Sequence, residues 1–317
     1  MITKKELMKA LHKHKYVKAH TARGLGLDDS TVRRACIRHN VDVEYEKRKM
    51  FANAEVKTYA VTRTSSNKKY GVGRFVVIPD LHSKHHSRRS FNAVLQFIED
   101  FAPEVIIQIG DLLDLFVLMD KVKQTSPSFS EQDFKDMDSD FEIGAELLSD
   151  ISSVAPKDCE KIWTLGNHEY RIDLLLNKFP HFANYLSIDK RMDTADWKVL
   201  PYLTPYKLGK LNVFHGEFWN ISHLRKHLQV YQKNVLYGHT HSIGQDTLQS
   251  PIREYPTWAG NVGCLCDLSP DYQRNKSNKW EHGFCYGYFD KKNGDFFPYI
   301  QRILNHRFIA EGKWYQG

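Results

Sequence analysis

This chain contains five short segments rich in aspartate and histidine, each at the point where a strand-like apolar run ends and a loop is expected to begin. All of them lie between residues 80 and 241. They read Asp80-Leu81-His82, Gly110-Asp111, Gly166-Asn167-His168-Glu169, His215-Gly216 and Gly238-His239-Thr240-His241. Carboxylate oxygens, imidazole nitrogens and amide oxygens are the ligands that divalent cations take from proteins. Together the segments predict one shared site for two metal ions.

The apolar runs beside these segments predict the fold. Runs of strand length occur at 75–78, 105–109, 161–165, 211–214 and 234–237, and apolar residues recur at helical spacing over 90–101 and 138–149. Strands that alternate with helices predict an α/β fold with helices flanking central sheets. Because ligands bind beyond the carboxyl ends of strands in open α/β sheets, we expect the five segments to meet at one edge.

The N-terminal residues differ from the rest of the chain in charge. Residues 1–50 hold 13 lysines and arginines against 6 aspartates and glutamates, a net charge of +7, whereas the remaining residues carry equal numbers of both signs. A basic module on a neutral body favours a polyanionic partner, most simply nucleic acid. A solvated, lysine-rich helical face is the alternative interpretation of the same charge.

Three helices are predicted within this basic module. Apolar spacing predicts the first over residues 4–16, and the glycines at 24 and 26 are expected to close the second, over residues 18–25. Asp29 or Ser30 is expected to cap the third, over residues 31–39. The sequence therefore predicts a small all-helical domain at the N-terminus.

Three stretches of the module resemble the helix-turn-helix of Fis-like and resolvase-like DNA-binding proteins. They are Thr21-Ala22-Arg23, Leu25-Gly26-Leu27 and Ser30-Thr31-Val32-Arg33-Arg34. In such units the second helix of the motif enters the major groove of DNA. The resemblance implies that DNA is a partner and that the residues facing it are Ser30, Thr31, Arg33, Arg34 and Arg38. A three-helix packing or protein-binding module with incidental charge is the alternative.

The five polar segments resemble the calcineurin-like metallophosphoesterase superfamily, whose pattern is Asp-x-His, Gly-Asp-x-x-Asp, Gly-Asn-His-Glu/Asp, His and Gly-His-x-His. The matching region spans about residues 74–302, and no core ligand position is missing. The resemblance implies a four-layer α-β-β-α sandwich with a dinuclear metal centre. It implies that the first metal takes Asp80, His82 and His241. It implies that the second takes Asn167, His215 and His239, and that Asp111 bridges both.

The resemblance also implies roles beside the metals. His168 matches the family's catalytic histidine, which contacts the substrate phosphate and protonates the leaving group. Asp114 and Glu169 match acids that orient the ligands or that histidine, and Arg171 is a candidate substrate contact. The expected reaction is phosphoester hydrolysis, in which a hydroxide bridging two divalent ions attacks phosphorus in line. Manganese is the expected metal, and iron, zinc and nickel suit the same ligands.

These segments do not identify the substrate. Protein serine/threonine phosphatases usually continue the second one as Gly-Asp-x-x-Asp-Arg-Gly, whereas residues 110–116 read Gly-Asp-Leu-Leu-Asp-Leu-Phe, which argues against that class. With the basic module, we expect a phosphodiesterase or nuclease acting on DNA. A nucleotide or small-molecule phosphatase or phosphodiesterase with a regulatory N-terminal module is the first alternative. A DNA-binding protein with a vestigial metal domain is the second.

The expected domain organisation is a basic module at 1–50, a polar linker at 51–73, the phosphoesterase domain at 74–305 and a C-terminal tail at 306–317. We expect a soluble cytoplasmic protein with no membrane partner, because no apolar stretch approaches the ~20 residues of a membrane span. The cysteines are odd in number and irregular in spacing, which argues against disulfides. We expect core positions for Cys264, Cys266, Trp258 and Trp280.

Overall fold

The computed structural model describes residues 2–14, 16–46, 71–270 and 277–317. The chain divides into two compact units, residues 1–67 and 68–317. The last four residues of the expected basic module and most of the expected linker at 51–73 lie outside the described residues.

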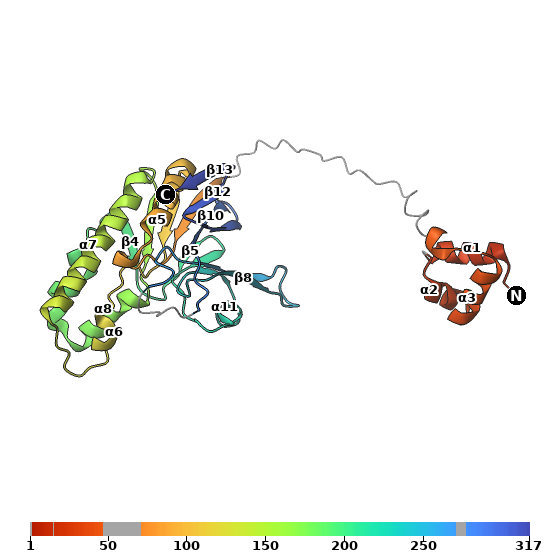
Figure 1. Ribbon diagram of the computed structural model, residues 1–317, viewed down its shortest axis with the longest axis horizontal. Coiled ribbons are helices and arrows are strands. Elements are labelled where there is room, and N and C mark those ends of the chain that lie inside the picture. The colour runs from red at the N-terminus through yellow and green to blue at the C-terminus, as the bar shows by residue number, and fades with distance from the viewer. Residues whose placement is uncertain (1, 15, 47–70, 271–276) are drawn as a thin grey trace. The chain divides into compact units, whose positions relative to one another are not determined.

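The N-terminal unit is helical, as expected. Its helices are α1 (Lys4–Lys13), α2 (Lys18–Leu25) and α3 (Asp29–Arg38), coloured red in Figure 1. The helix α2 ends at Gly26, whose φ of +65° lies in the left-handed region that favours glycine. The apolar faces of all three helices share one small core, which includes Leu7, Leu11, Ala22, Val32 and Cys36.

The cap of α3 differs from the expectation. Asp28, rather than Asp29 or Ser30, is the N-cap, because its backbone is still extended (φ −79°, ψ 157°) and its carboxylate accepts from the N–H of Thr31 at 2.7 Å. The same carboxylate accepts from the hydroxyl groups of Ser30 at 2.6 Å and Thr31 at 2.7 Å. Two of the residues expected to face DNA are therefore bonded to their own helix cap.

The larger sheet of the second unit has six strands in the order β11-β10-β1-β2-β3-β4. The strands β1 to β4 are parallel to one another, and β10 and β11 add an antiparallel edge. Every residue of β2 is buried, as is typical of parallel strands covered on both faces. The bounds are β1 (Val72–Ile78), β2 (Val105–Gln108), β3 (Glu160–Thr164), β4 (Trp197–Leu200), β10 (Gly283–Asp290) and β11 (Phe296–Arg302).

The smaller sheet has five strands in the order β5-β6-β7-β9-β8. Its strands are β5 (Tyr206–Leu208), β6 (Leu211–Val213), β7 (Asn234–Tyr237), β8 (Ile243–Leu248) and β9 (Thr257–Val262). The inner faces of the two sheets share one apolar core. Phe75 and Ile107 come to this core from the larger sheet, and Val213 and Leu236 come from the smaller one.

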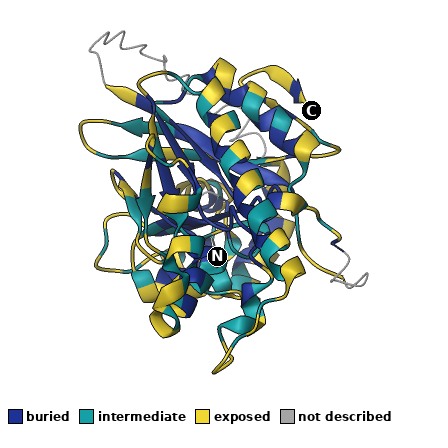
Figure 2. Cartoon of the chain, turned by 90° about the vertical axis from the view of Figure 1, so that its left-hand side faces the viewer, coloured by how far each residue is buried: buried dark blue, intermediate teal, exposed yellow. Residues whose placement is uncertain are grey.

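Helices cover the outer faces of both sheets, which confirms the expected four-layer α-β-β-α sandwich. The larger sheet packs against α5 (Arg88–Phe101), α7 (Glu131–Val154) and α8 (Asn167–Lys178), and the smaller sheet packs against α11 (His223–Tyr231). Figure 2 shows the buried strands between helices whose outer faces are exposed. Shorter helical segments are η1 (Ser83–His85), α6 (Leu118–Lys121), η2 (Pro180–Phe182), α9 (Ala183–Leu186) and α10 (Ile188–Arg191).

The segment expected as a C-terminal tail is part of the domain. Residues 306–317 contain a hairpin of β12 (Arg307–Ala310) and β13 (Lys313–Gln316). Phe308 and Tyr315 stack on each other at 5.2 Å between ring centroids, and Tyr315 meets Phe97 of α5 at 5.3 Å. The hairpin therefore closes one side of the core.

Within the residues that the structure describes, no helix combines the length and the apolar character that a membrane span needs.

Candidate metal centre

The polar segments meet at the carboxyl ends of the strands, as expected. Asp80 follows β1, Asp111 follows β2, Asn167 follows β3, His215 follows β6, and His239 follows β7. Their side chains form two clusters that share Asp111. We call Asp80, His82 and His241 the first cluster, and Asn167, His215 and His239 the second cluster.

The first cluster brings two imidazoles and a carboxylate to one point. His82 Nε2 lies 3.1 Å from His241 Nε2, which in turn lies 3.5 Å from Asp80 Oδ1. The carboxylate of Asp111 approaches from the other side, with Oδ2 3.8 Å from His82 Nε2. These side chains are at most 7% exposed, so the charges among them are poorly screened by water.

The second cluster has the same form. His215 Nε2 lies 2.9 Å from Asn167 Oδ1 and 3.2 Å from His239 Nδ1. It also lies 3.3 Å from Asp111 Oδ2, the oxygen that faces the first cluster. One carboxylate oxygen therefore stands between the two clusters.

The protons of these histidines show what the clusters can bind. His215 Nδ1 lies 2.9 Å from the carbonyl oxygen of Ile109, which can only accept, so the proton of the neutral ring is on Nδ1. The lone pair of His215 Nε2 then faces the oxygens of Asn167 and Asp111. When buried hydrogen-bond acceptors face one another, they repel unless a cation or an added proton lies between them. A donor set of nitrogen and oxygen atoms fits divalent metal ions.

Strained backbone accompanies the clusters. His82 (φ +54°), Asp111 (φ +47°), His239 (φ +66°) and His241 (φ +57°) all lie in the left-handed region that side chains rarely adopt. Such conformations persist only where the surrounding structure imposes them, and they gather at functional sites. The strain indicates that these residues are held for their chemistry.

Two glycines allow the strand ends to approach the carboxylates closely. A Cβ on Gly166 would lie 2.2 Å from Asp111 Oδ1, and a Cβ on Gly238 would lie 2.1 Å from Asp80 Oδ2. Both distances are shorter than any atom contact allows. Any larger residue at these positions would therefore displace a carboxylate.

A model of the calcineurin-like phosphoesterase family matches residues 73–271, more than half of the chain. The chain belongs to this family. The match confirms the expected family and identifies the chain as a phosphoester hydrolase. Calcineurin-like phosphoesterases use divalent metal ions. Among the described residues, three groups of side chains at this site have ligand atoms close enough to hold an ion: His82, His241 and Cys266; His82, Asp111 and His168; and Asp111, His215 and His239.

Relatives of this phosphoesterase include two phage proteins. The Gene 54 protein of Mycobacterium phage L5 is 24% identical over 256 residues, 76% of this chain and 97% of that protein. The Gene 54 protein of Mycobacterium phage D29 is 25% identical over 257 residues, 75% of this chain and 97% of that protein.

Similar solved structures include Vps29 from Cryptosporidium parvum, with a TM-score of 0.38 and 10% identity, covering 78% of this chain and 96% of that one. Vps29 from Chaetomium thermophilum has a TM-score of 0.40 and 10% identity, covering 77% and 98%.

His168 stands beside the phosphoesterase clusters and belongs to neither. Its backbone N–H donates to Asp111 Oδ1 at 3.0 Å, and its Nδ1 lies 2.5 Å from the carbonyl oxygen of Asp114. That carbonyl fixes the proton of the neutral ring on Nδ1, so the lone pair is on Nε2, which lies 3.8 Å from Asp111 Oδ2. The side chain is 16% exposed, whereas Asp80 and His215 are fully buried. Burial lowers the pKa of His168 to about 3.

The two acids beside the clusters have distinct contacts. Asp114 Oδ1 accepts from His82 Nδ1 at 3.1 Å, which leaves His82 Nε2 as a lone pair toward the first cluster. Glu169 accepts from the backbone N–H groups of Asp111 at 3.0 Å, Leu113 at 2.8 Å and Gly166 at 2.7 Å. Asp114 thus orients a ligand side chain, and Glu169 holds the loops that carry Asp111 and His168.

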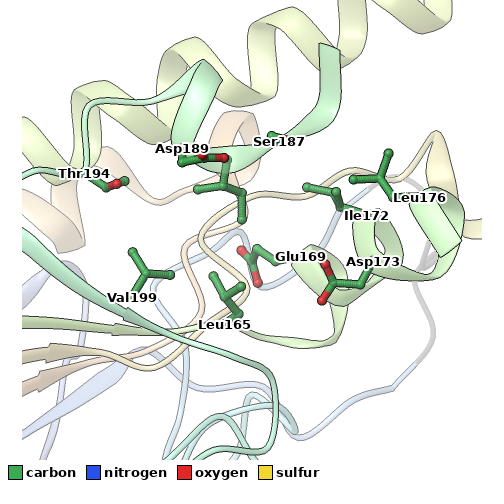
Figure 3. A pocket seen from close by; sticks show the side chains of 10 residues that line it. Leu165, Glu169, Ile172, Asp173, Leu176, Ser187, Asp189, Thr194 and Val199 are labelled. Carbon is green, nitrogen blue, oxygen red and sulfur yellow. The ribbon is translucent and has the colours of Figure 1, made fainter. Parts of the chain in front are cut away.

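Glu169 also borders a pocket of about 320 Å³ that is lined by residues of α8, α10 and β4. Figure 3 shows its carboxylate among Leu165, Ile172, Asp173 and Val199. Burial and the charge of Asp111 raise the pKa of Glu169 to about 7. The side chain that accepts from the three backbone N–H groups is buried, because Glu169 is only 1% exposed.

Replacing Glu169 by glutamine is expected to weaken the centre without touching a candidate ligand. The amide NH₂ of glutamine would face at least one of the three backbone N–H groups, leaving a buried donor unpaired. We expect unfolding free energy to fall by ~1–3 kcal/mol and metal affinity to fall by roughly 10- to 100-fold. Urea unfolding and metal titration measure both changes. Glu142→Gln, at an exposed position on α7, is the control, and full metal affinity in Glu169→Gln would contradict the positioning role.

Arg171, the candidate substrate contact, is hydrogen-bonded to the loop that carries Asp114. Its guanidinium donates to the carbonyl oxygens of Asp114 at 3.1 Å and Leu115 at 3.2 Å. These bonds tie α8 to the loop that carries Asp114. Arg171 therefore supports the carbonyl that orients His168.

Sequence reasoning missed several neighbours of the clusters. Trp280, expected in the core, is half-buried and lies against the imidazole of His241, with ring centroids 4.3 Å apart. Cys266 is buried as expected, but its Sγ lies 3.6 Å from His241 Nδ1. Cys264 is buried as well, Trp258 is half-buried, and the cysteines are free thiols. No local pattern marks these neighbours, because loops distant in sequence bring them to the site.

The candidate DNA residues lie in the other unit, on an exposed side of α3. The guanidinium of Arg33 pairs with Asp29 at 2.8 Å, and Arg34 Nε donates to the carbonyl oxygen of Ser30 at 3.3 Å. Arg38, near the end of the helix, is exposed. Both contacts lie at the exposed surface, where an ion pair such as that of Arg33 with Asp29 contributes little to stability.

Proposed function

We propose that the chain is a phosphodiesterase with two divalent metal ions. Asp80, His82 and His241 would hold the first ion, and Asn167, His215 and His239 the second. Asp111 would bridge them. The observation that carries the proposal is the position of Asp111 Oδ2, which lies 3.8 Å from His82 Nε2 and 3.3 Å from His215 Nε2. Bound ions would supply positive charge to a phosphate and lower the pKa of a water molecule.

His168 is the proposed general acid. Its low pKa keeps the imidazole neutral in the free protein. A phosphate beside the ring favours the protonated form, because an opposite charge raises the pKa of a histidine. Substrate binding therefore brings in the proton that the ring later gives to the leaving oxygen. The carbonyl of Asp114 holds Nδ1–H, so Nε2 would be the atom that gives the proton to that oxygen.

DNA is the proposed substrate, delivered by the N-terminal unit. The net charge of +7 on residues 1–50 supports an anionic partner. The arrangement of α2, a short turn through Gly26 and α3 is compatible with a helix-turn-helix, and α3 would be the recognition helix.

One observation favours the second candidate function, a nucleotide or small-molecule phosphatase or phosphodiesterase. Ser30, Thr31 and Arg33 make hydrogen bonds to Asp28 or Asp29 at the start of their own helix. Two carboxylates at this end of α3 would also repel DNA phosphates. In this case the N-terminal unit would regulate or localise the enzyme.

A substrate panel separates the two functions. The full chain with Mn²⁺ is incubated with labelled single- and double-stranded DNA, cyclic nucleotides, dinucleotides and p-nitrophenyl esters. Cleavage of DNA supports the first function. Strong hydrolysis of a small phosphoester with intact DNA would overturn it and favour the second.

The salt dependence of DNA binding tests the role of α3. If Arg33 and Arg34 bind phosphates, affinity falls steeply as salt rises, and Arg33→Ala with Arg34→Ala lowers the slope of log K against log[salt] by about 1 for each phosphate that is no longer neutralised. Fluorescence anisotropy at several salt concentrations measures the slope. Lys4→Ala with Lys5→Ala, on exposed positions of α1, removes the same charge from another helix. An unchanged slope in the α3 variant would remove this helix from the DNA interface.

A further inference from the structure

We infer that aromatic side chains around the two clusters bind a nucleobase of the substrate, with Trp219 as the principal platform. The inference rests on the proposed phosphodiesterase function. It identifies the chemistry of the group attached to the phosphate, which the metal ligands leave open.

Aromatic rings from separate loops border three imidazoles of the clusters. Each pair is described by the distance between its ring centroids. The pairs are Trp280 with His241 at 4.3 Å, Trp219 with His239 at 6.1 Å, and Tyr202 with His215 at 6.2 Å. Tyr202 also stacks on Tyr170 at 5.0 Å. A phosphate bound at the clusters would therefore lie beside aromatic rings.

Trp219 is the ring most available to a ligand. It is 78% exposed. Burying the apolar surface of an indole is favourable, so a ligand that covers this ring would be stabilised. Its ring meets His239 edge to face, at 78° between the planes, so the contact covers little of the indole. A ring that only orients His239 could be buried. A ring that stacks on a planar ligand must keep one face open to solvent.

The loop before Trp219 is anchored by α11. The backbone N–H of Glu217 donates to His227 Nε2 at 3.1 Å, and the ammonium group of Lys226 lies 4.1 Å from the ring centroid of Phe218. Burial lowers the pKa of His227 to about 4, so its neutral ring accepts this bond. An exposed ring on an anchored loop is a preformed platform, because little conformational freedom remains to be lost when a ligand binds.

Trp280 is held by a different contact. The backbone N–H of the next residue, Glu281, donates to the carbonyl oxygen of His241 at 2.8 Å. Trp280 and Trp219 therefore adjoin different histidines of the same loop. A phosphodiester has an organic group on each side of phosphorus, and the two tryptophans offer one platform for each. Bases stack on aromatic side chains with little preference for sequence, as a general nuclease requires.

The test compares two competitors that differ only in the base. 2′-Deoxyadenosine 5′-monophosphate and 2-deoxyribose 5-phosphate are used to inhibit hydrolysis of methyl p-nitrophenyl phosphate by the full chain with Mn²⁺. We expect the nucleotide to inhibit more tightly by roughly 5- to 100-fold, the range of base–aromatic stacking. In Trp219→Ala this ratio should fall toward one, because only the nucleotide carries a base that stacks on the indole. A structural defect would weaken both competitors equally.

Trp314→Ala is the matched control. Trp314 is 63% exposed on β13, in the C-terminal hairpin, and should keep the ratio of the unmodified protein. Phenyl phosphate is a third competitor. If it inhibits as tightly as the nucleotide, the platform takes a smaller aromatic group and the nucleobase assignment is overturned.

A binding measurement separates this inference from the proposed function. Tryptophan fluorescence is titrated with the nucleotide and with deoxyribose 5-phosphate in His168→Ala, with and without Trp219→Ala. Quenching by the nucleotide that disappears with Trp219 supports the inference, even if no diester is hydrolysed. Hydrolysis of diesters with equal inhibition by both competitors would overturn the inference and leave the proposed function standing.

Discussion

Replacing His168 by alanine is expected to lower kcat by roughly 10²- to 10⁴-fold while both metal ions stay bound. The imidazole belongs to neither cluster, and its nearest approach to a shared oxygen is 3.8 Å, to Asp111 Oδ2. The loss should depend on the leaving group. The alkoxide of a DNA diester needs a proton to depart, whereas p-nitrophenolate does not, so bis-p-nitrophenyl phosphate should show the smaller defect.

Metal content decides between a proton donor and a ligand at position 168. It is measured by mass spectrometry of the purified variant after reconstitution with Mn²⁺, beside the rates on both esters. His181→Ala, at an exposed position on η2, removes a histidine that belongs to neither cluster and should change neither quantity. Loss of metal from His168→Ala would place this residue in the ligand set.

Replacing Asp111 by asparagine is expected to have the largest effect on the centre. Asparagine keeps the shape of the side chain and removes the charge that lies between the clusters. Because Asp111 is the proposed ligand shared by both ions, loss of its charge weakens both sites, and we expect fewer than two ions per chain. If the metals then supply ~4 kcal/mol less stabilisation to the transition state, activity falls by roughly 10³-fold. Calorimetric metal titration and the initial rate with excess Mn²⁺ measure the two losses. Two tightly bound ions in Asp111→Asn would contradict the bridging role.

The pH dependence of metal affinity gives an independent readout of the same carboxylate. Burial lowers the pKa of His215, but the charges of Asp111 and Asp80 outweigh burial and raise it to about 9 in the metal-free protein. Because a metal ion needs the neutral ring, binding releases this proton. Affinity should therefore rise with pH up to about 9. In Asp111→Asn the pKa of His215 falls, so the rise should end at lower pH.

Asp120→Asn is the matched control for Asp111→Asn. The side chain of Asp120 is 73% exposed on α6 and pairs with Lys123 at 3.5 Å on the surface. The same exchange there should leave metal content, rate and pH dependence unchanged.

Much of the fold can be predicted because local sequence already favours it. The strands β2 and β7 coincide with short apolar runs of the sequence, and α2 spans the expected residues 18–25. The helix α7 shows the limit of this approach. Apolar spacing predicts residues 138–149, but the helix runs from Glu131 to Val154, and the capping box of Ser130 and Asp133 sets its start. Polar residues separate Phe134 and Met137 in the added turns, so apolar periodicity alone does not mark where the helix begins.

The convergence of the candidate ligands could be predicted for a related reason. Its residues directly follow apolar runs, so their convergence follows from the strands being parallel. The rings around the centre have no such signal. Trp280 reaches His241 because Glu281 bonds to the backbone of that residue, and Trp219 depends on the anchor at His227. The sequence marks which residues can bind metal, whereas only the tertiary structure shows what borders them.

The pairing of β1 with β10 has a consequence for how this enzyme is made. Val72 pairs with Asp290 and Val77 with Cys285, so the middle of the larger sheet joins two distant parts of the chain. Every proposed metal ligand leaves the ribosome before β10 exists. Until then β1 can pair with β2 on one side, but its other edge is unpaired, and unpaired strand edges are prone to aggregation. Distant pairings also form slowly. The yield of active enzyme should therefore depend on protecting the nascent chain until residue 290 has been synthesised.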